Sequence, residues 1–283
     1  ICAVTAAMEN GTGLGEFSVK YPSRFFDVGI AEEHAVTMAS GMASQGLKPV
    51  FAVYSSFLQR GYDQLIHDVA IARNNVVFAI DRAGLVGADG ETHQGIFDVP
   101  YILSIPGIKL FSPSSFAELK SAVRRALYQE DGPVAVRFPR GGEGVYRDDS
   151  IDMPEVCIRQ GSDITLAGYG IMINNLIKAA EILEASGISA EIIKINELSH
   201  ICSDCLEDSV KKTGRLIVAE DCAEGGCLGQ RILSQLLEKQ ICPRCRLINL
   251  GSRFIPHGGV EQLYERYGID GQSIADKAKE IMI

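Results

Sequence analysis

Residues 26–38 read FDVGIAEEHAVTM. They continue a β-like stretch that begins at Arg24, pass through a tight Gly-Ile-Ala turn, and enter a helix that opens on Glu32 and Glu33. A strand, a turn and a helix in this order hold a side chain at the carboxyl end of a sheet, where open α/β folds bind ligands. The segment therefore predicts an α/β fold that presents an acid, with His34 beside it.

An acid at the start of a helix also has a simpler explanation. Carboxylates are favoured there because the helix dipole places partial positive charge at the N-terminus. Taken alone, this segment favours such a capping role. A catalytic role for Glu32 or Glu33 needs support from the rest of the chain.

The bulk properties of the 283-residue chain are those of a globular protein. Its length suffices for two domains of ordinary size, and with 46% hydrophobic and 22% charged residues it can bury hydrophobic cores. The net charge of −9 argues against a nucleic acid or a membrane surface as the main partner. No apolar run approaches the roughly 18 residues of a membrane span. Because the chain starts in mid-pattern at Ile1, we expect that a further segment precedes it.

The eight cysteines include two CxxC pairs, Cys202 with Cys205 and Cys242 with Cys245, a spacing found in zinc sites. The first pair follows a predicted strand and the second precedes one. The pairs would then lie at opposite edges of a sheet, and a shared zinc ion would have to span it. We therefore expect no metal on this chain, and reduced thiols in a cytoplasmic protein.

Short apolar runs alternate with amphipathic stretches along the chain. In the first half, the pattern predicts strands at 1–5, 24–28, 48–53, 76–80, 109–111 and 134–137, and helices at 32–45, 57–72 and 116–129. In the second half, it predicts strands at 164–168, 190–195, 215–220 and 246–250, and helices at 172–186, 202–213, 226–239 and after 260. Such alternation is typical of mostly parallel sheets with helices on both faces.

The alternation breaks between the two halves. Residues 140–161 carry glycines at 141, 142 and 144, an Arg-Asp-Asp triplet and a proline, without a helical period. We interpret residues 146–160 as a linker, which predicts domains at 1–145 and 161–283. The predicted fold class is thus two consecutive, mostly parallel α/β domains.

Four motifs of the first half carry a family resemblance: IAEEHAV at 30–36, YSSFLQRGYDQLIHDV at 54–69, AIDRAGLVGADGETHQGIFD at 79–98 and VRFPRGG at 136–142. They resemble the 1-deoxy-D-xylulose-5-phosphate synthases, which belong to the transketolase-like, thiamine-diphosphate-dependent enzymes. TAAMENGTGL near the start, NLGSRFIPHG at 249–258 and YGIDGQSI near the end extend the resemblance over essentially the whole chain. It implies a pyrimidine-binding domain followed by the family's C-terminal domain.

The resemblance implies a cofactor site in the first half. Glu32 matches the family's catalytic glutamate, which bonds the aminopyrimidine ring of thiamine diphosphate and promotes loss of a proton from the thiazolium carbon. Phe57 would stack on the same ring, and Tyr54 would line the site. Glu33 stands where the family often has Gln, so we expect a structural role for it.

Matched arginines point to a phosphorylated substrate. Arg82 and Arg140 would grip the phosphate of an aldehyde, because guanidinium groups suit phosphate oxygens, and Arg60 and Tyr54 would lie with them. Without the motifs, each arginine would be interpreted as a solvated surface charge or a salt-bridge partner.

A Gly-rich loop would complete the site. Asp89 would fix a substrate hydroxyl and His93 would move protons near neutral pH. His257, from the second half, would position other residues. Three glycines would let the loop backbone approach a ligand closely: Gly84, Gly87 and Gly90.

The resemblance also implies a missing part. Family members carry an earlier domain that holds the cofactor diphosphate and Mg²⁺ through a GDG motif followed by Asn, and that motif does not occur in this sequence. We therefore expect the C-terminal section of a homodimeric synthase that condenses pyruvate with D-glyceraldehyde 3-phosphate, inactive alone. Alternatives are the second subunit of a split transketolase, a β-type subunit of a 2-oxo-acid dehydrogenase, or a non-catalytic dimer scaffold.

Overall fold

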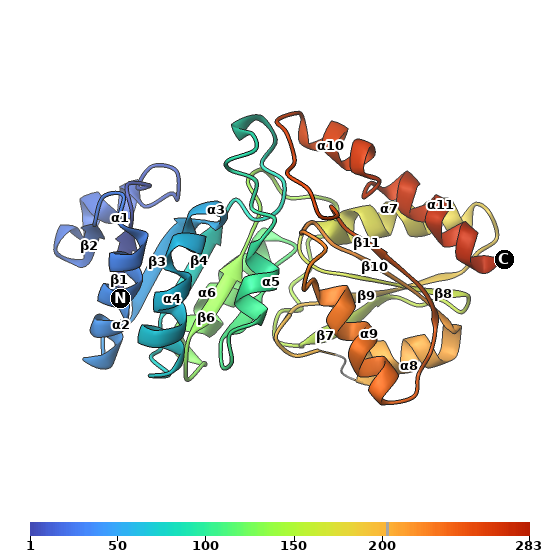
Figure 1. Cartoon of the computed structure of the whole chain (residues 1–283), viewed down its shortest axis with the longest axis horizontal. Helices are drawn as coiled ribbons and strands as arrows, with labels where there is room; N and C mark the ends of the chain where they lie inside the picture. Colours follow the sequence, from blue (N-terminus) through green and yellow to red (C-terminus); the bar gives the residue numbers. More distant parts are fainter. Residues whose placement is uncertain (202–203) are drawn as a thin grey trace.

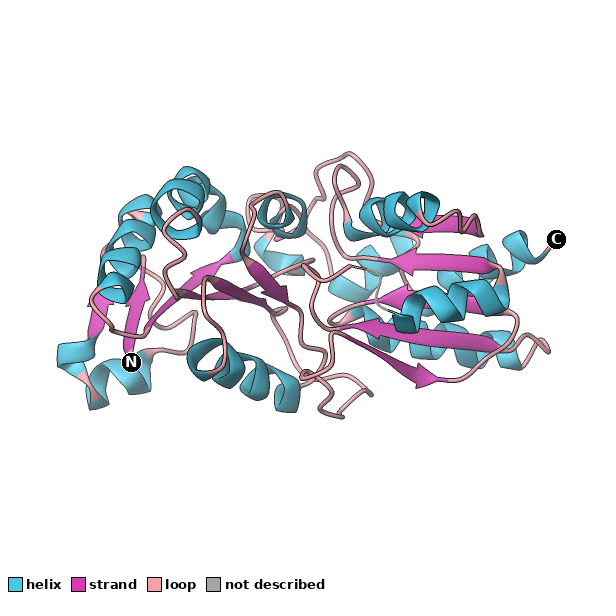
Figure 2. Cartoon of the chain, turned by 90° about the horizontal axis from the view of Figure 1, so that it is seen from below, coloured by secondary structure: helices cyan, strands magenta, loops and turns pink. Residues whose placement is uncertain are grey.

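The computed structural model describes residues 1–201 and 204–283, which form two α/β domains side by side (Figure 1). Helices lie on both sides of each sheet (Figure 2). The predicted fold class, two consecutive and mostly parallel α/β domains, is confirmed. Within the described residues, no helix has the length and apolar character needed to cross a bilayer.

The strands of the first sheet all run parallel, in the order β2-β1-β3-β4-β6-β5. They are β1 (Cys2–Thr5), β2 (Phe25–Asp27), β3 (Pro49–Tyr54), β4 (Val77–Asp81), β5 (Lys109–Phe111) and β6 (Val134–Arg137). Helices cover both faces, so the inner strands are largely buried and appear in the sequence as apolar runs. The strand order reverses between β1 and β3, the position where such sheets bind ligands at their carboxyl ends.

The helices of the first domain include one region that differs from the prediction. They are α1 (Gly15–Lys20), α2 (Glu32–Ser44), α3 (Ser55–Leu58), α4 (Tyr62–Gln64), α5 (Asp98–Leu103) and α6 (Phe116–Tyr128). The single helix predicted at 57–72 is wrong, because a 3₁₀ turn (Gln59–Gly61) separates α3 from α4 and a π-helix (Leu65–Ala70) follows. A Cβ on Gly61 would lie 2.9 Å from a Val36 methyl, so α2 packs directly against this turn.

The second sheet has the order β11-β10-β8-β9-β7, with β7 antiparallel to β9. Its strands are β7 (Glu155–Arg159), β8 (Ile164–Gly168), β9 (Ala190–Ile195), β10 (Arg215–Ala219) and β11 (Arg244–Ile248). Its helices are α7 (Met172–Glu184), α8 (Asp204–Thr213), α9 (Leu228–Glu238), α10 (Val260–Tyr267) and α11 (Gly271–Met282). The end of the segment interpreted as a linker, 146–160, thus forms β7. Both edge strands are partly exposed and lack the apolar run that marks the inner ones.

The two domains share a packed interface. One apolar cluster contains residues of both, such as Ile105 and Leu110 from the first and Ile193 and Leu198 from the second. The loop that joins β4 to α5, loop 82–97, reaches the segment before α10 at the top of Figure 1. There the Gly258 N–H donates to the Gly87 carbonyl at 3.4 Å. Loop 82–97 therefore belongs to the first domain but lies against the second.

Candidate active site

The residues predicted to carry the chemistry all follow the carboxyl ends of strands in the first sheet. Glu32 begins α2 after β2, and Tyr54 is the last residue of β3. The others follow β3, β4 or β6: Phe57, Arg60, Arg82, Asp89, His93 and Arg140. The contacts below link these eight residues into one cluster. The structure thus brings them together, and their chemical roles stay predictions.

Glu32 lies at the buried end of the cluster. It is 1% exposed, and its Oε1 accepts a hydrogen bond from Arg60 Nη1 at 2.6 Å. Its Oε2 is buried and has no hydrogen-bond partner within the described residues. The residue before it, Ala31, occupies the N-cap position of α2 without a side-chain cap. The contacts of Glu32 therefore do not support the capping role, and they leave one carboxylate oxygen open to another donor.

Aromatic rings connect Glu32 to the loop residues. The rings of Tyr54 and Phe57 stack with centroids 5.7 Å apart, and the His93 ring meets Phe57 edge-on at 5.2 Å. The Arg60 guanidinium lies 4.8 Å from the Phe57 centroid. Both Tyr54 and Phe57 are partly exposed. They can therefore offer aromatic surface to a ligand next to Glu32.

Asp89 joins the two arginines predicted to grip a phosphate. Its Oδ2 accepts from Arg82 Nη1 at 2.8 Å, and its Oδ1 accepts from Arg140 Nη1 at 2.5 Å. Arg82 also stacks on Tyr54, with 3.8 Å between the guanidinium carbon and the ring centroid. Arg60 lies apart from this bridge, paired with Glu32. The arginine pair therefore already holds one anionic group, and Arg60 is differently placed from Arg82 and Arg140.

Arg82 has a strained backbone. Its φ is +60°, in the left-handed region that side-chain-bearing residues rarely adopt. The preceding Asp81 supports this conformation, because its Oδ1 accepts from the Arg82 N–H at 2.6 Å. Burial raises the pKa of Asp81, although the bond from Arg82 and the charges of Arg82 and Arg140 act in the opposite direction. Strain of this kind tends to be kept at ligand-binding positions.

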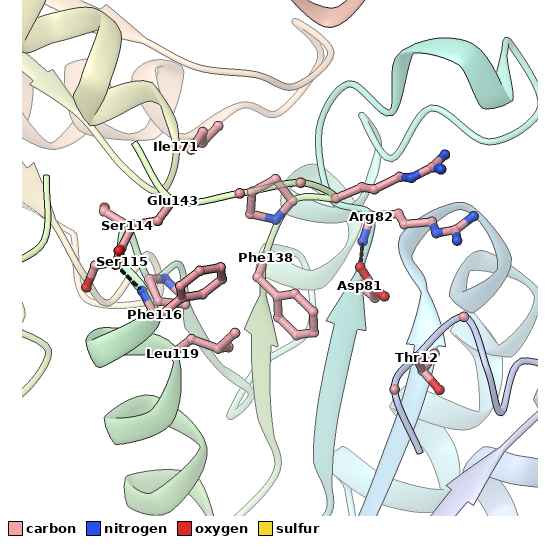
Figure 3. A pocket seen from close by; sticks show the side chains of 17 residues that line it. Thr12, Asp81, Arg82, Ser114, Ser115, Phe116, Leu119, Phe138, Glu143 and Ile171 are labelled. Carbon is pink, nitrogen blue, oxygen red and sulfur yellow. Dashed lines mark hydrogen bonds between the residues drawn. The ribbon is translucent and has the colours of Figure 1, made fainter. Parts of the chain in front are cut away.

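A cavity of about 410 Å³ opens beside the arginines. It extends from Thr12 across the ends of β4 and β6 to the start of α6 (Figure 3). Its far wall carries Ser114, whose buried Oγ has no partner in the described part of the chain, and the half-exposed Phe116. No motif of the sequence predicts this wall. The local signal there, Ser115 followed by Glu118, marks the start of a helix, and Ser115 Oγ indeed accepts from the Glu118 N–H at 3.1 Å.

The three loop glycines face the second domain, and their close approach to a ligand stays a prediction. A Cβ on Gly84 would lie 2.0 Å from Asp221 Oδ2, and one on Gly87 would lie 2.9 Å from the Gly258 carbonyl oxygen. A Cβ on Gly90 would come within 3.4 Å of His257. The absence of side chains therefore lets the second domain approach the loop. The sequence shows that a Cβ is missing, but not which group takes its place.

The structure separates the cysteines as their order in the chain predicts. Cys205 lies in α8, beyond the carboxyl end of β9, whereas Cys245 lies at the start of β11. Cys202 falls outside the described residues. In residues 1–201 and 204–283, no group of three His, Cys, Asp or Glu side chains is arranged to hold a metal ion.

Comparison with known proteins identifies the class to which this fold and site belong. Residues 1–142 match the family model of the transketolase pyrimidine-binding domain, and residues 156–274 match that of the transketolase C-terminal domain. The chain therefore belongs to the transketolase family. The two domains occur in the order that the motifs implied.

Within this family, the chain is similar to 1-deoxy-D-xylulose-5-phosphate synthases. It is 43% identical to that of Heliobacterium modesticaldum over 286 residues and 44% identical to that of Clostridium kluyveri over 288. These matches cover 99% and 100% of this chain but 44% and 46% of the relatives, so the chain spans less than half of their length. The matched region is their C-terminal part, and the resemblance stated from the motifs is confirmed.

A solved structure has the same fold over nearly the whole chain. It is described as a split gene transketolase, inactive beta4 tetramer, and it aligns with a TM-score of 0.85 at 25% identity. The alignment covers 99% of this chain and 91% of that one.

Proposed function

We propose that this chain supplies the pyrimidine-binding part of the active site of a 1-deoxy-D-xylulose-5-phosphate synthase, a transferase that condenses pyruvate with D-glyceraldehyde 3-phosphate and releases CO₂. The observation that carries the proposal is the Glu32 carboxylate. It is buried, with Oε1 bonded to Arg60 and Oε2 lacking a partner within the described residues. A buried acceptor without a donor is costly unless a ligand provides one. A protonated nitrogen of an aminopyrimidine ring would do so.

The surroundings of Glu32 fit thiamine diphosphate. Phe57 and Tyr54 offer aromatic surface on which a flat ring can stack. When bound, thiamine diphosphate supplies the electron sink that lets pyruvate lose CO₂. Glu32 Oε2 would accept the hydrogen bond from the ring nitrogen and exchange the proton with it, while Arg60 fixes the other carboxylate oxygen in place.

The arginine pair would select a phosphorylated aldehyde. We assign the phosphate to Arg82 and Arg140, with Tyr54 beneath Arg82 and Arg60 nearer to Glu32. A phosphate dianion accepts stronger hydrogen bonds than a carboxylate, so it would take the place of Asp89 between the guanidinium groups. Asp89 would then be free to bond a substrate hydroxyl, and His93 would transfer protons at its ring nitrogens.

The proposal includes parts that this chain does not supply. We assign the cofactor diphosphate and Mg²⁺ to a further domain, and we expect activity only in its presence. We further propose a cytoplasmic homodimer that binds neither nucleic acid nor membrane. Open space around the exposed Gly41 of α2 permits close helix packing, and we expect a dimer interface well above ~1,000 Å². A monomeric mass by light scattering at micromolar concentration would contradict the dimer.

A second candidate is a subunit of a split transketolase. The likeness to a solved split gene transketolase over 99% of this chain favours it. Such a subunit would use the same Glu32 but would transfer a two-carbon unit between sugar phosphates without releasing CO₂. A β-type subunit of a 2-oxo-acid dehydrogenase and a non-catalytic scaffold lack a comparable observation.

The reaction itself separates the candidates. The chain should be combined with the diphosphate-binding domain of a synthase relative, fused or as a partner, and incubated with pyruvate and D-glyceraldehyde 3-phosphate. We expect CO₂ and 1-deoxy-D-xylulose 5-phosphate in equal amounts, and loss of both products in the Glu32→Ala variant. Transfer between sugar phosphates without CO₂ would favour the transketolase subunit. Pyruvate turnover by the 283 residues alone would contradict the assignment of the cofactor diphosphate to a further domain.

A further inference from the structure

The second domain forms one wall against which loop 82–97 is folded. Where Gly84 and Gly87 lack side chains, the space is filled by Asp221 and Gly258 of the second domain, and His257 lies at ordinary contact distance from Gly90. The loop carries Asp89 and His93 between its ends. The positions of these two side chains therefore depend on contacts with the other domain.

Hydrogen bonds fix the loop to the same wall. Gln94 is buried; its Oε1 accepts from the Val86 N–H at 2.8 Å, and its Nε2 donates to the Pro256 carbonyl at 3.1 Å. The Ala223 N–H donates to the Ile96 carbonyl at 2.8 Å. Gln94 thus closes the loop upon itself and ties it to the second domain, directly beside His93.

Asp221 contacts both segments that lead to the arginine pair. Its Oδ1 accepts from Arg137 Nη1 at 3.1 Å, and its Oδ2 fills the space beside Gly84. Arg137 is the last residue of β6, three positions before Arg140, and its Nε donates to Asp98 at 3.0 Å. The side chains of Asp221, Arg137 and Asp98 are all buried. A single carboxylate from the second domain therefore contacts two segments of the first. One is loop 82–97, which carries Arg82, Asp89 and His93, and the other is the end of β6, which precedes Arg140.

We propose that Asp221 is a positioning residue of the active site, through which the second domain sets the spacing between loop 82–97 and the Arg140 segment. This inference rests on the proposed function, because it assigns the substrate phosphate to Arg82 and Arg140. Asp221 lies behind these segments and acts through Gly84 and Arg137. Since misplacement of a binding group by about 1 Å can cost on the order of a hundredfold in rate, a small shift of either segment should be measurable.

The neighbouring residue provides a matched control. Glu220 is also a buried carboxylate at the end of β10, but it accepts hydrogen bonds from groups of the second domain: Tyr169, Cys222, Leu228 and Gly229. Asp221→Asn and Glu220→Gln make the same chemical change in adjacent residues. Only the first alters a contact with the loop and with Arg137.

The kinetic test uses the complete enzyme. We expect Asp221→Asn to raise KM for D-glyceraldehyde 3-phosphate about tenfold or more, while CO₂ release from pyruvate without the aldehyde changes less than about twofold. Glu220→Gln should leave both values near those of the wild type. An unchanged aldehyde KM in Asp221→Asn, or an equal rise in Glu220→Gln, would overturn the inference.

A second measurement does not depend on activity. Hydrogen exchange of peptides from residues 84–96 in the 283-residue chain should be faster in Asp221→Asn than in the wild type, with the strands of the first sheet unchanged. Unchanged loop exchange would overturn the inference even if synthase activity is established, and faster exchange would support it even if that activity is absent.

If Asp221→Asn does not fold, a second variant tests the inference from the loop side. Gln94→Met removes the hydrogen bond to Pro256 and should give the same exchange and KM changes. A Gln94→Met variant that resembles the wild type would overturn the inference.

Discussion

Each of the two sheets has a buried acid at its carboxyl edge, but the two acids differ in how many of their oxygens accept hydrogen bonds. At the first edge, Glu32 is 1% exposed and keeps one oxygen without a partner within the described residues. At the second edge, Glu220 is fully buried, and its oxygens accept from Gly229 at 2.8 Å, Leu228 at 2.9 Å and Tyr169 at 3.1 Å. One edge therefore remains open to a ligand, whereas the other is used to cap α9 and to pack against the first domain.

The comparison shows that the two buried acids differ in hydrogen-bond satisfaction and not in burial. Burial raises the pKa of Glu220, although its bonds from the α9 backbone, Cys227 and Tyr169 act in the opposite direction. A raised carboxyl pKa often marks a functional site. Here it accompanies a helix cap, whereas Glu32 differs from Glu220 in keeping an oxygen without a hydrogen-bond partner in the described residues.

The largest effect expected at the open edge concerns the cofactor. In the proposed function, the first domain would supply only the pyrimidine end of a thiamine diphosphate site, and the diphosphate with Mg²⁺ would contribute most of the charge-driven affinity. The chain alone should bind thiamine diphosphate on the order of a thousandfold more weakly than it does with the diphosphate-binding domain present. Titration calorimetry on both forms measures this ratio. Equal affinities would mean that the chain holds the whole cofactor.

Glu118 is a buried acid of the first domain whose two oxygens both accept hydrogen bonds, so its loss should reduce stability, as we expect for Glu220. Glu118, at the start of α6, is fully buried and accepts from Ser114, Tyr146, Ser150 and Lys194. Glu118→Ala would leave the Lys194 ammonium buried without its 2.8 Å partner, and we expect a loss of about 3–5 kcal/mol in the free energy of unfolding. Urea unfolding measures this loss. A cost below about 1 kcal/mol would show that the interface does not depend on the pair.

The smallest effect expected is a pH dependence at the second edge. Because burial raises the pKa of Glu220, the fold favours its protonated form. Its contribution to stability is fully present below the unfolded pKa, near pH 4.5, and is lost as the pH rises through the folded pKa. Glu220→Gln cannot titrate, so its free energy of unfolding should lack this decrease. Parallel pH profiles for the variant and the wild type would contradict the assignment.

The sequence predicts most of the fold because its inner strands are buried on both faces. Strands such as β6 and β8 have the predicted bounds, since each is a short apolar run between polar turns. The edge strands β7 and β11 are half-exposed and were missed or displaced. The break after α3 depends on contact with α2, which no local pattern reports.

The spatial clustering of the predicted site residues follows from the sequence to a similar extent. The eight residues of the cluster were found because the family motifs hold them in short stretches, such as Asp89 and His93 in one loop. Arg137 and Asp98 lie in the same motifs, but the hydrogen bond from Arg137 to Asp221 spans 84 residues and leaves no local signal. Which group faces a glycine or fills a cavity is a property of packing, and a single sequence does not state it.

The same substitution at the two edges tests the proposed role of Glu32 most directly. Glu32→Gln and Glu220→Gln should be prepared in the complete enzyme and compared by pyruvate decarboxylation and by urea unfolding. We expect Glu32→Gln to lose about a thousandfold in decarboxylation rate with little loss of stability, because in the proposed site its open oxygen would bond the cofactor and makes no hydrogen bond within the described residues. Glu220→Gln should keep the rate and lose about 1–3 kcal/mol, because it leaves a backbone donor of α9 less well satisfied. A Glu32→Gln enzyme that still decarboxylates pyruvate at the wild-type rate would contradict the central claim.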